Sequence, residues 1–167
     1  WIGQDPSPSI DAGLAEIASC IASPEPDPYC IDVQARLLSA RYAWHNQQRI
    51  NDIRMIAHAY QLSRQALSKI GDEPDALLSS GEIALQLAQA TPPLVKSQRT
   101  TLHEGIGSID RALAASPGWP RALVVKGALL LERSKLERSL LQKRASLSAA
   151  RDALAAGITG NPLLKRR

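Results

Sequence analysis

The sequence is poor in aromatic side chains and rich in small and aliphatic ones. Its 167 residues contain no Phe and only 4% aromatics, whereas Ala occurs 25 times and Leu 23 times. Aromatic and β-branched residues favour strands, and Ala and Leu favour helices, so this composition argues against an all-β fold. An apolar fraction of 44% with 22% charged residues is typical of a globular protein and not of a disordered one.

Long hydrophobic runs, metal-ligand clusters and catalytic motifs are also missing. No apolar run approaches the roughly 20 residues that span a bilayer, so we expect no transmembrane segment. Two Cys cannot form a four-ligand zinc site, and the three His show no ligand spacing. The sequence has no nucleophile-elbow or zinc-protease motif and no glycine-rich phosphate loop. We therefore predict a protein without catalytic residues, metal or cofactor, which is not an enzyme.

The net charge of +4 is unevenly distributed along the chain. Residues 1–95 hold 6 Lys/Arg and 11 Asp/Glu, a net charge of −5, and residues 96–167 hold 14 and 5, a net charge of +9. Surfaces of opposite sign influence association with partners more than they influence the fold.

Proline positions and hydrophobic periodicity predict seven helices. None of the eleven prolines interrupts a stretch with helical periodicity. The predicted helices span about residues 9–22, 29–45, 50–70, 74–90, 95–115, 119–133 and 136–157. Seven helices with short connections indicate an all-α array of antiparallel helical hairpins.

A period of 46 residues runs along the chain. Pro28, Pro74 and Pro120 are separated by 46 residues, and each precedes a predicted helix. Small residues recur in two columns of the helices that follow, Gly13, Ala59, Gly105 and Ala150 in one and Cys20, Ala66, Ala112 and Gly157 in the other. Small side chains two turns apart allow a neighbouring helix to approach closely. Repetition of the same contact predicts a solenoid.

These columns, with a proline after the second helix, resemble the tetratricopeptide repeat. The matching residues are Gly81, Gly105, Ala112 and Pro117 in one pair of helices and Gly127, Ala150, Gly157 and Pro162 in the next. The tetratricopeptide repeat has 34 residues, so about 12 extra residues fall around the turn within each pair, and HEAT-type repeats of about 40–47 residues are the structural alternative. The resemblance implies an α-α superhelix.

The resemblance also implies a division of the chain, because it covers residues 9–164. Residues 1–8 are then a linker, 9–27 an unpaired second helix, 28–73, 74–119 and 120–164 three helix pairs, and 165–167 a basic tail.

A partner-binding groove is a further implication of the resemblance. In tetratricopeptide arrays the first helix of each pair lines the concave face, where an extended or helical segment of another protein docks. Carried over position by position, the groove residues are Tyr29, Asp32, Arg36, Ser39 and Ala40, then Asp75, Leu78, Glu82, Leu85 and Gln86, then Arg121, Val124, Ala128, Leu131 and Glu132. Their mixed polarity suits a peptide with apolar and charged anchors. The alternative is that they form ordinary solvated helix faces.

Cys20 and Cys30 flank the SPEPDP connector almost symmetrically. Their repeat equivalents are all small, Ala66 with Ala76 and Ala112 with Ala122. We expect the two cysteines to be close neighbours, within the Cα separation of about 7 Å that a disulfide needs. The sequence leaves open whether they are bonded or are two buried thiols, because the compartment decides this.

Basic residues gather toward the C-terminal end. Arg138, Arg144 and Arg151 form a basic patch, and the last two share a helix face because they are seven residues apart. Such a patch suits an acidic partner, an anionic membrane surface or phosphate. A solvated outer face is the favoured interpretation, and the absence of interleaved aromatic residues argues against nucleic acid.

The phrases DRALAASPGWPRAL and NPLL also resemble the C-terminal regions of bacterial serine/threonine kinases of the eukaryotic type. No kinase motif is present, so this resemblance implies an accessory or sensory region of a signalling protein that binds a protein or peptide partner. Its compartment is open, cytoplasmic, or periplasmic if a membrane-spanning kinase tethers it. Two alternatives also stay open, a nucleic-acid-associated regulator that uses the basic helices and a structural self-association module.

Overall fold

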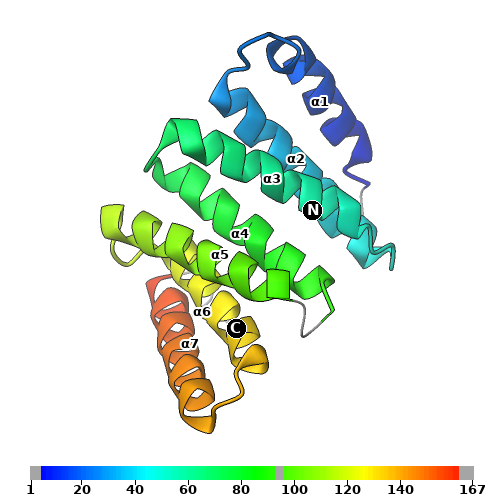
Figure 1. The fold of residues 1–167 in the computed structure, drawn as a ribbon. Helices are drawn as coiled ribbons and strands as arrows, with labels where there is room; N and C mark the ends of the chain where they lie inside the picture. Colours follow the sequence, from blue (N-terminus) through cyan, green and yellow to red (C-terminus); the bar gives the residue numbers. More distant parts are fainter. Residues whose placement is uncertain (1–4, 93–95, 162–167) are drawn as a thin grey trace. The chain divides into compact units, whose positions relative to one another are not determined.

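The computed structural model describes residues 5–92 and 96–161, and this part of the chain is all helical, without strands (Figure 1). Its seven helices are α1 (Ser7–Ile21), α2 (Pro28–Gln47), α3 (Ile53–Ile70), α4 (Pro74–Ala90), α5 (Lys96–Ala115), α6 (Pro120–Leu136) and α7 (Leu140–Gly160). The prediction of seven helices in an all-α fold is confirmed. Residues 1–4 of the expected linker, the end of the third pair at 162–164 and the basic tail 165–167 lie outside the described residues.

The three prolines that recur with a period of 46 begin helices α2, α4 and α6. Proline is favourable there because the first helical residues need no backbone N–H donor and the fixed φ angle suits the helix. Side-chain caps support two of these starts. The Asp27 carboxylate accepts a hydrogen bond from the Tyr29 N–H at 2.8 Å, and Glu73 accepts one from the Ala76 N–H at 2.6 Å. Both caps satisfy backbone donors that the helix leaves unpaired.

The chain divides into two compact units, one ending at Gly71 and one beginning at Asp72. This boundary falls just before Pro74, where the second helix pair was expected to begin. The first unit contains α1, α2 and α3, in which α2 contacts both of the others. The second unit contains α4 to α7, in which each helix contacts the next and α4 also contacts α6.

The first unit is organised around one apolar face of α2. Ile31, Ala35 and Tyr42 lie on that face, and each is at most 4% exposed. On α1, a Cβ atom added at Gly13 would lie 3.1 Å from the Leu37 side chain of α2, so the two helices are close at this point.

The second unit has an apolar core to which all four of its helices contribute. Leu77, Ile83, Leu102, Ile109 and Leu129 are among its most completely buried side chains. Burial of a side chain of this size contributes roughly 1.5–3 kcal/mol relative to leaving it in water. Leu85, Leu113 and Trp119 pack against the core from its margin.

Several small residues of the second unit lie at close helix–helix contacts. A Cβ atom added at Gly105 of α5 would lie 2.8 Å from the Ala84 Cβ of α4, and one added at Gly127 of α6 would lie 2.5 Å from the Leu154 Cγ of α7. Such distances leave no room for a side chain. Ala112, in the second column, is 0% exposed. In this unit, therefore, the small columns of the sequence mark helix–helix contacts.

Helices α6 and α7 are long, and the connection between them is short. Helices α6 and α7 contain 17 and 21 residues, and only residues 137–139 connect them. The predicted end of one helix at 133 and the predicted start of the next at 136 are wrong by about a turn. A buried polar cluster accounts for the difference. Ser146 is 1% exposed, its hydroxyl donates to Glu137 Oε1 at 2.9 Å, and Arg133 Nη2 donates to Ser146 Oγ at 3.1 Å. Glu137 takes an extended backbone conformation, which ends α6.

Candidate partner-binding site

An exposed stripe runs along α2 in the first unit. Tyr29 is 57% exposed and Val33 38%, and the Arg36 side chain is 54% exposed. Residues spaced by three and four lie on one helix face, so these three side chains form a continuous surface. We call Tyr29, Val33 and Arg36 the α2 stripe.

Asp32 lies beside this stripe but is not part of its surface. It is 5% exposed, and its Oδ2 lies 3.8 Å from Arg36 Nη1. The burial of Asp32 argues against its expected role as a direct partner contact. Its carboxylate forms an ion pair with the Arg36 guanidinium, at a separation longer than a hydrogen bond.

Two expected groove residues of the second unit bind each other. Arg121 of α6 donates to both carboxylate oxygens of Glu82 of α4, Nε to Oε1 at 2.6 Å and Nη2 to Oε2 at 2.8 Å. A two-bond pair of this kind fixes both side chains and is stronger than a single hydrogen bond. The helices α4 and α6 are thereby joined across their outer face, and the two charges largely compensate each other.

The other expected groove residues of this unit have different environments. Leu78 is 3% exposed and belongs to the core, so it does not line an open groove. Val124 is half-buried, and its Cγ2 would lie 2.8 Å from a Cβ atom added at Gly157, so it faces α7. Asp75 is exposed, Gln86 is half-buried and Leu131 is 41% exposed.

Leu78 and Val124 were expected to line the groove, but Leu78 is buried in the core and Val124 packs against α7. Val33 was missed, although an apolar residue between Tyr29 and Arg36 at spacings of four and three was a visible signal. Of the remaining positions, Ser39 is 8% exposed and Ala40 is exposed, whereas Leu85, Ala128 and Glu132 are half-buried.

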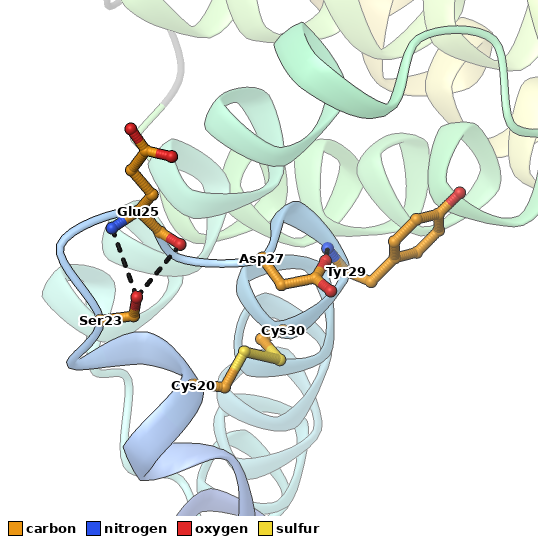
Figure 2. The surroundings of a disulfide bond; sticks show 6 residues. All are labelled: Cys20, Ser23, Glu25, Asp27, Tyr29 and Cys30. Atoms are coloured by element: carbon orange, nitrogen blue, oxygen red, sulfur yellow. Dashed lines mark hydrogen bonds between the residues drawn. A yellow bond between two sulfur atoms is a disulfide. The ribbon is translucent and has the colours of Figure 1, made fainter.

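Cys20 and Cys30 are joined by a disulfide in the structure, with their Cα atoms 6.4 Å apart. Figure 2 shows the bond between the last turn of α1 and the first turn of α2, beneath the connector. The Ser23 side chain bonds to the backbone of Glu25 within that connector. The α2 stripe begins at Tyr29, next to the bonded Cys30, so the disulfide anchors the end of the helix that carries the stripe.

The basic patch lies at the α6–α7 connection and along α7. Arg138, Arg144 and Arg151 are all exposed, and Arg151 Nη2 lies 3.0 Å from the neighbouring Asp152 Oδ1. Large apolar side chains accompany the patch, Leu140 at 74%, Leu141 at 78% and Ile158 at 47% exposure. Reasoning from the charges alone missed these residues, whose spacing of 18 between Leu140 and Ile158 places both on one helix face.

Among the described residues, Asp5 and Tyr42 have shifted pKa values, and both shifts have structural causes. Hydrogen bonding to Ser7, whose N–H lies 2.8 Å from Asp5 Oδ1, lowers the pKa of Asp5 just before α1. Burial raises the pKa of Tyr42, whose hydroxyl donates to Asn51 Oδ1 at 3.1 Å. In the described ranges no three His, Cys, Asp or Glu side chains gather as metal ligands would. None of the helices described there has the length and apolarity to cross a membrane.

Comparisons of the chain with protein-family models, with curated proteins and with solved structures found no match.

Proposed function

We propose that this chain is a protein-binding module built from antiparallel, tetratricopeptide-like helix pairs, and that it holds a segment of another protein against the α2 stripe. The observation that carries the proposal is the exposure of Tyr29 and Val33 beside Arg36, an exposed arginine that forms an ion pair with the buried Asp32. Exposed aromatic and arginine side chains are the types that most often dominate the binding energy of interfaces.

The chemistry of the stripe defines the segment that it would bind. Tyr29 and Val33 offer apolar contact area, and Arg36 offers hydrogen-bond donors to a carboxylate. Tyr29 and Arg36 are seven residues apart, which is about 10 Å along a helix axis. The matching segment therefore presents a large apolar side chain and an Asp or Glu about 10 Å apart, as an extended peptide does across three to four residues.

The second unit contributes less to this proposal, because Glu82 and Arg121 already satisfy each other. A partner would have to break that two-bond pair before it could use either charge. We therefore assign the main binding energy to the α2 stripe.

The larger context that we propose is an accessory or sensory region of a signalling protein, such as a bacterial serine/threonine kinase. Its support is the resemblance of the phrases around residues 110–123 and 161–164. The sequence that flanks this chain in its gene is the direct test. A kinase domain in the same gene supports the context, and a gene product without one removes it.

The binding proposal is tested by selecting peptides from a random library with the intact, oxidised chain. Selected peptides should contain the apolar residue and the carboxylate. Their affinity should fall by about tenfold or more for Tyr29→Ala and for Arg36→Ala, because each removes an anchor. Gln61→Ala, at an exposed position on α3, is the matched control and should leave the affinity unchanged. Peptides that bind all four proteins equally would refute the role of the stripe.

A further inference from the structure

Helix α7 has an apolar face that no helix of the described chain covers. Leu140, Leu147 and Ile158 are 74%, 39% and 47% exposed. Their spacings of 7 and 11 place them on one face of the helix, and Arg144 and Arg151 lie between them on that face. We call these five residues the α7 face.

The corresponding face of α5, 45 residues earlier in the chain, is covered by α6. Leu102, Ile106 and Leu113 stand in α5 where Leu147, Arg151 and Ile158 stand in α7. Leu102 and Ile106 are 0% and 7% exposed, and Leu113 packs against the core. The residues of the α7 face therefore stand at the positions that, one repeat earlier in α5, are covered by a helix.

Polar contacts fix how α6 lies on α5. Arg99 Nη2 donates to the carbonyl oxygen of Leu136, the last residue of α6. Nearer the other end of α5, Asp110 Oδ1 lies 2.7 Å from Lys126 Nζ. The C-terminal end of α6 is thus held near the N-terminal end of α5.

The charges of the two faces differ. Arg144 of α7 corresponds to Arg99, but Ala155 replaces Asp110 and Arg151 replaces Ile106. The face of α5 carries one positive and one negative charge, whereas the α7 face carries two arginines, of which Arg151 pairs with the exposed Asp152 beside the face at 3.0 Å. A helix that complements α7 therefore needs no lysine at the place of Lys126, which would face Ala155, and it needs a carboxylate opposite Arg151, four residues earlier in α7.

We infer that the α7 face docks an amphipathic helix of a separate, acidic protein, and that this helix runs along α7 as α6 runs along α5. Its apolar side chains cover Leu147 and Ile158. A carboxylate pairs with Arg151, and its C-terminal carbonyl groups accept hydrogen bonds from Arg144. This surface is separate from the α2 stripe, so the inference does not depend on the proposed function.

Charge complementarity favours an acidic helix of another protein over the segments of this chain that could cover the α7 face. Helix α6 of a second copy carries four basic residues and one acidic residue and would meet a face of the same sign. Residues 162–167 contain no acidic residue and three basic ones, Lys165, Arg166 and Arg167. Helix α1 has two exposed acidic residues, Asp11 and Glu16, but Asp11 already pairs with Arg41, and the other exposed residues of α1 are Pro8, Ala and Ser.

Two matched peptides test the inference with the intact, oxidised chain. One has the 17-residue sequence of α6. The other is the same peptide with Lys126→Glu, Arg133→Glu and Lys135→Glu, which keeps the apolar pattern and reverses the charge. Fluorescence anisotropy should show that the acidic peptide binds about tenfold tighter at low salt, and that the difference narrows when salt screens the charges.

Variants of the chain assign the binding to the α7 face. Leu147→Asp should weaken the acidic peptide by about tenfold, because it places a carboxylate in the apolar contact and adds like-charge repulsion. The double variant Arg144→Glu/Arg151→Glu should reverse the order of the two peptides. Lys69→Glu, at an exposed position of α3, is the charge-reversal control and should change neither affinity.

Several results would overturn the inference. One is equal affinity of the chain for the two peptides. Another is no binding of either peptide up to about 1 mM, a dissociation constant that corresponds to a binding free energy of roughly 4 kcal/mol. A third is binding of the acidic peptide that is unchanged by Leu147→Asp. Concentration-dependent dimers that Leu147→Asp abolishes would assign the face to a second copy of this chain. Binding of duplex DNA or anionic vesicles that requires Arg144 and Arg151 but not Leu147 would assign it to a polyanion.

Discussion

Tyr42 shows how a single buried polar group supports the first unit. It is 4% exposed, lies on the core face of α2, and donates its hydroxyl hydrogen to Asn51 beyond the end of that helix. One side chain thus combines apolar burial with a hydrogen bond to the α2–α3 connection. A buried hydroxyl without a partner would be costly, so the bond to Asn51 allows the ring to remain inside.

Tyr42→Phe should separate these two contributions. At pH 7 the variant should lose about 1 kcal/mol of unfolding free energy with the hydrogen bond. Because burial raises the pKa of Tyr42 above 10.0, the neutral phenol stabilises the folded state fully below pH 10, and this stabilisation is lost as the pH rises through the raised value.

Urea unfolding of both proteins at pH 7 and near pH 11 measures the effect. The native protein should lose more stability between the two pH values than the variant, because only the native protein has a phenol at position 42 to ionise. Identical pH dependence in the two proteins would show that Tyr42 does not titrate abnormally.

At the scale of elements, the disulfide ties α1 to α2 across the proline-rich connector. The bonded residues are 10 apart in sequence, and the equivalent positions of α5 and α6 are Ala112 and Ala122, both 0% exposed. Helices α5 and α6 therefore contact each other without such a bond. The contribution of the disulfide is to restrict the unfolded chain and to fix the start of α2 beside Tyr29.

The double variant Cys20→Ala/Cys30→Ala should remove this restriction and little else. A closed loop of this length contributes about 2–3 kcal/mol to stability in the chain-entropy account. Denaturant unfolding with and without a reducing agent checks the expectation. The oxidised native protein should lose this stability when it is reduced, whereas the variant should have the same unfolding free energy with and without the reducing agent. A native protein that is equally stable when reduced would contradict it.

Much of the helix pattern was predictable from the sequence, because it depends on local chemistry. Pro74 and Pro120 begin helices where a missing N–H costs nothing, and Gly71 and Thr91 follow helix ends. The break between α6 and α7 was misplaced because Glu137 makes a non-local hydrogen bond to the buried Ser146. A contact of that kind leaves no periodic signal in the sequence.

The candidate site was only partly predictable. Tyr29 and Arg36 are exposed as expected, because their spacing alone places them on one face away from Ile31 and Ala35. Leu78 and Asp32 are buried, and Glu82 and Arg121 pair with each other, because neighbouring helices decide these environments. The rotation of one helix against another is set by packing, which a position-by-position comparison with a shorter repeat does not contain.

At the scale of the molecule, the difference in net charge between the two units is smaller than the difference between residues 1–95 and 96–167. The unit ending at Gly71 has 6 Lys/Arg and 7 Asp/Glu, and the unit beginning at Asp72 has 14 and 9. Net charges of −1 and +5 follow. The acidic residues at 72–82 lie in the same unit as α7, so the positive charge of this unit is unevenly distributed. The α7 face is basic because arginines gather on it, and not only because the whole unit has a positive net charge.

Two glycines of α5 test the proposal that a helix-pair module repeats by close contact at small residues. A Cβ atom added at Gly105 would lie 2.8 Å from Ala84, whereas one added at Gly107 would meet nothing within 4 Å. The unfolding free energies of Gly105→Ala and Gly107→Ala should change in opposite directions. Gly107→Ala should gain about 0.5–1 kcal/mol from helix propensity, and Gly105→Ala should lose about 1–3 kcal/mol to overpacking. Equal stabilisation by both substitutions would contradict the proposal.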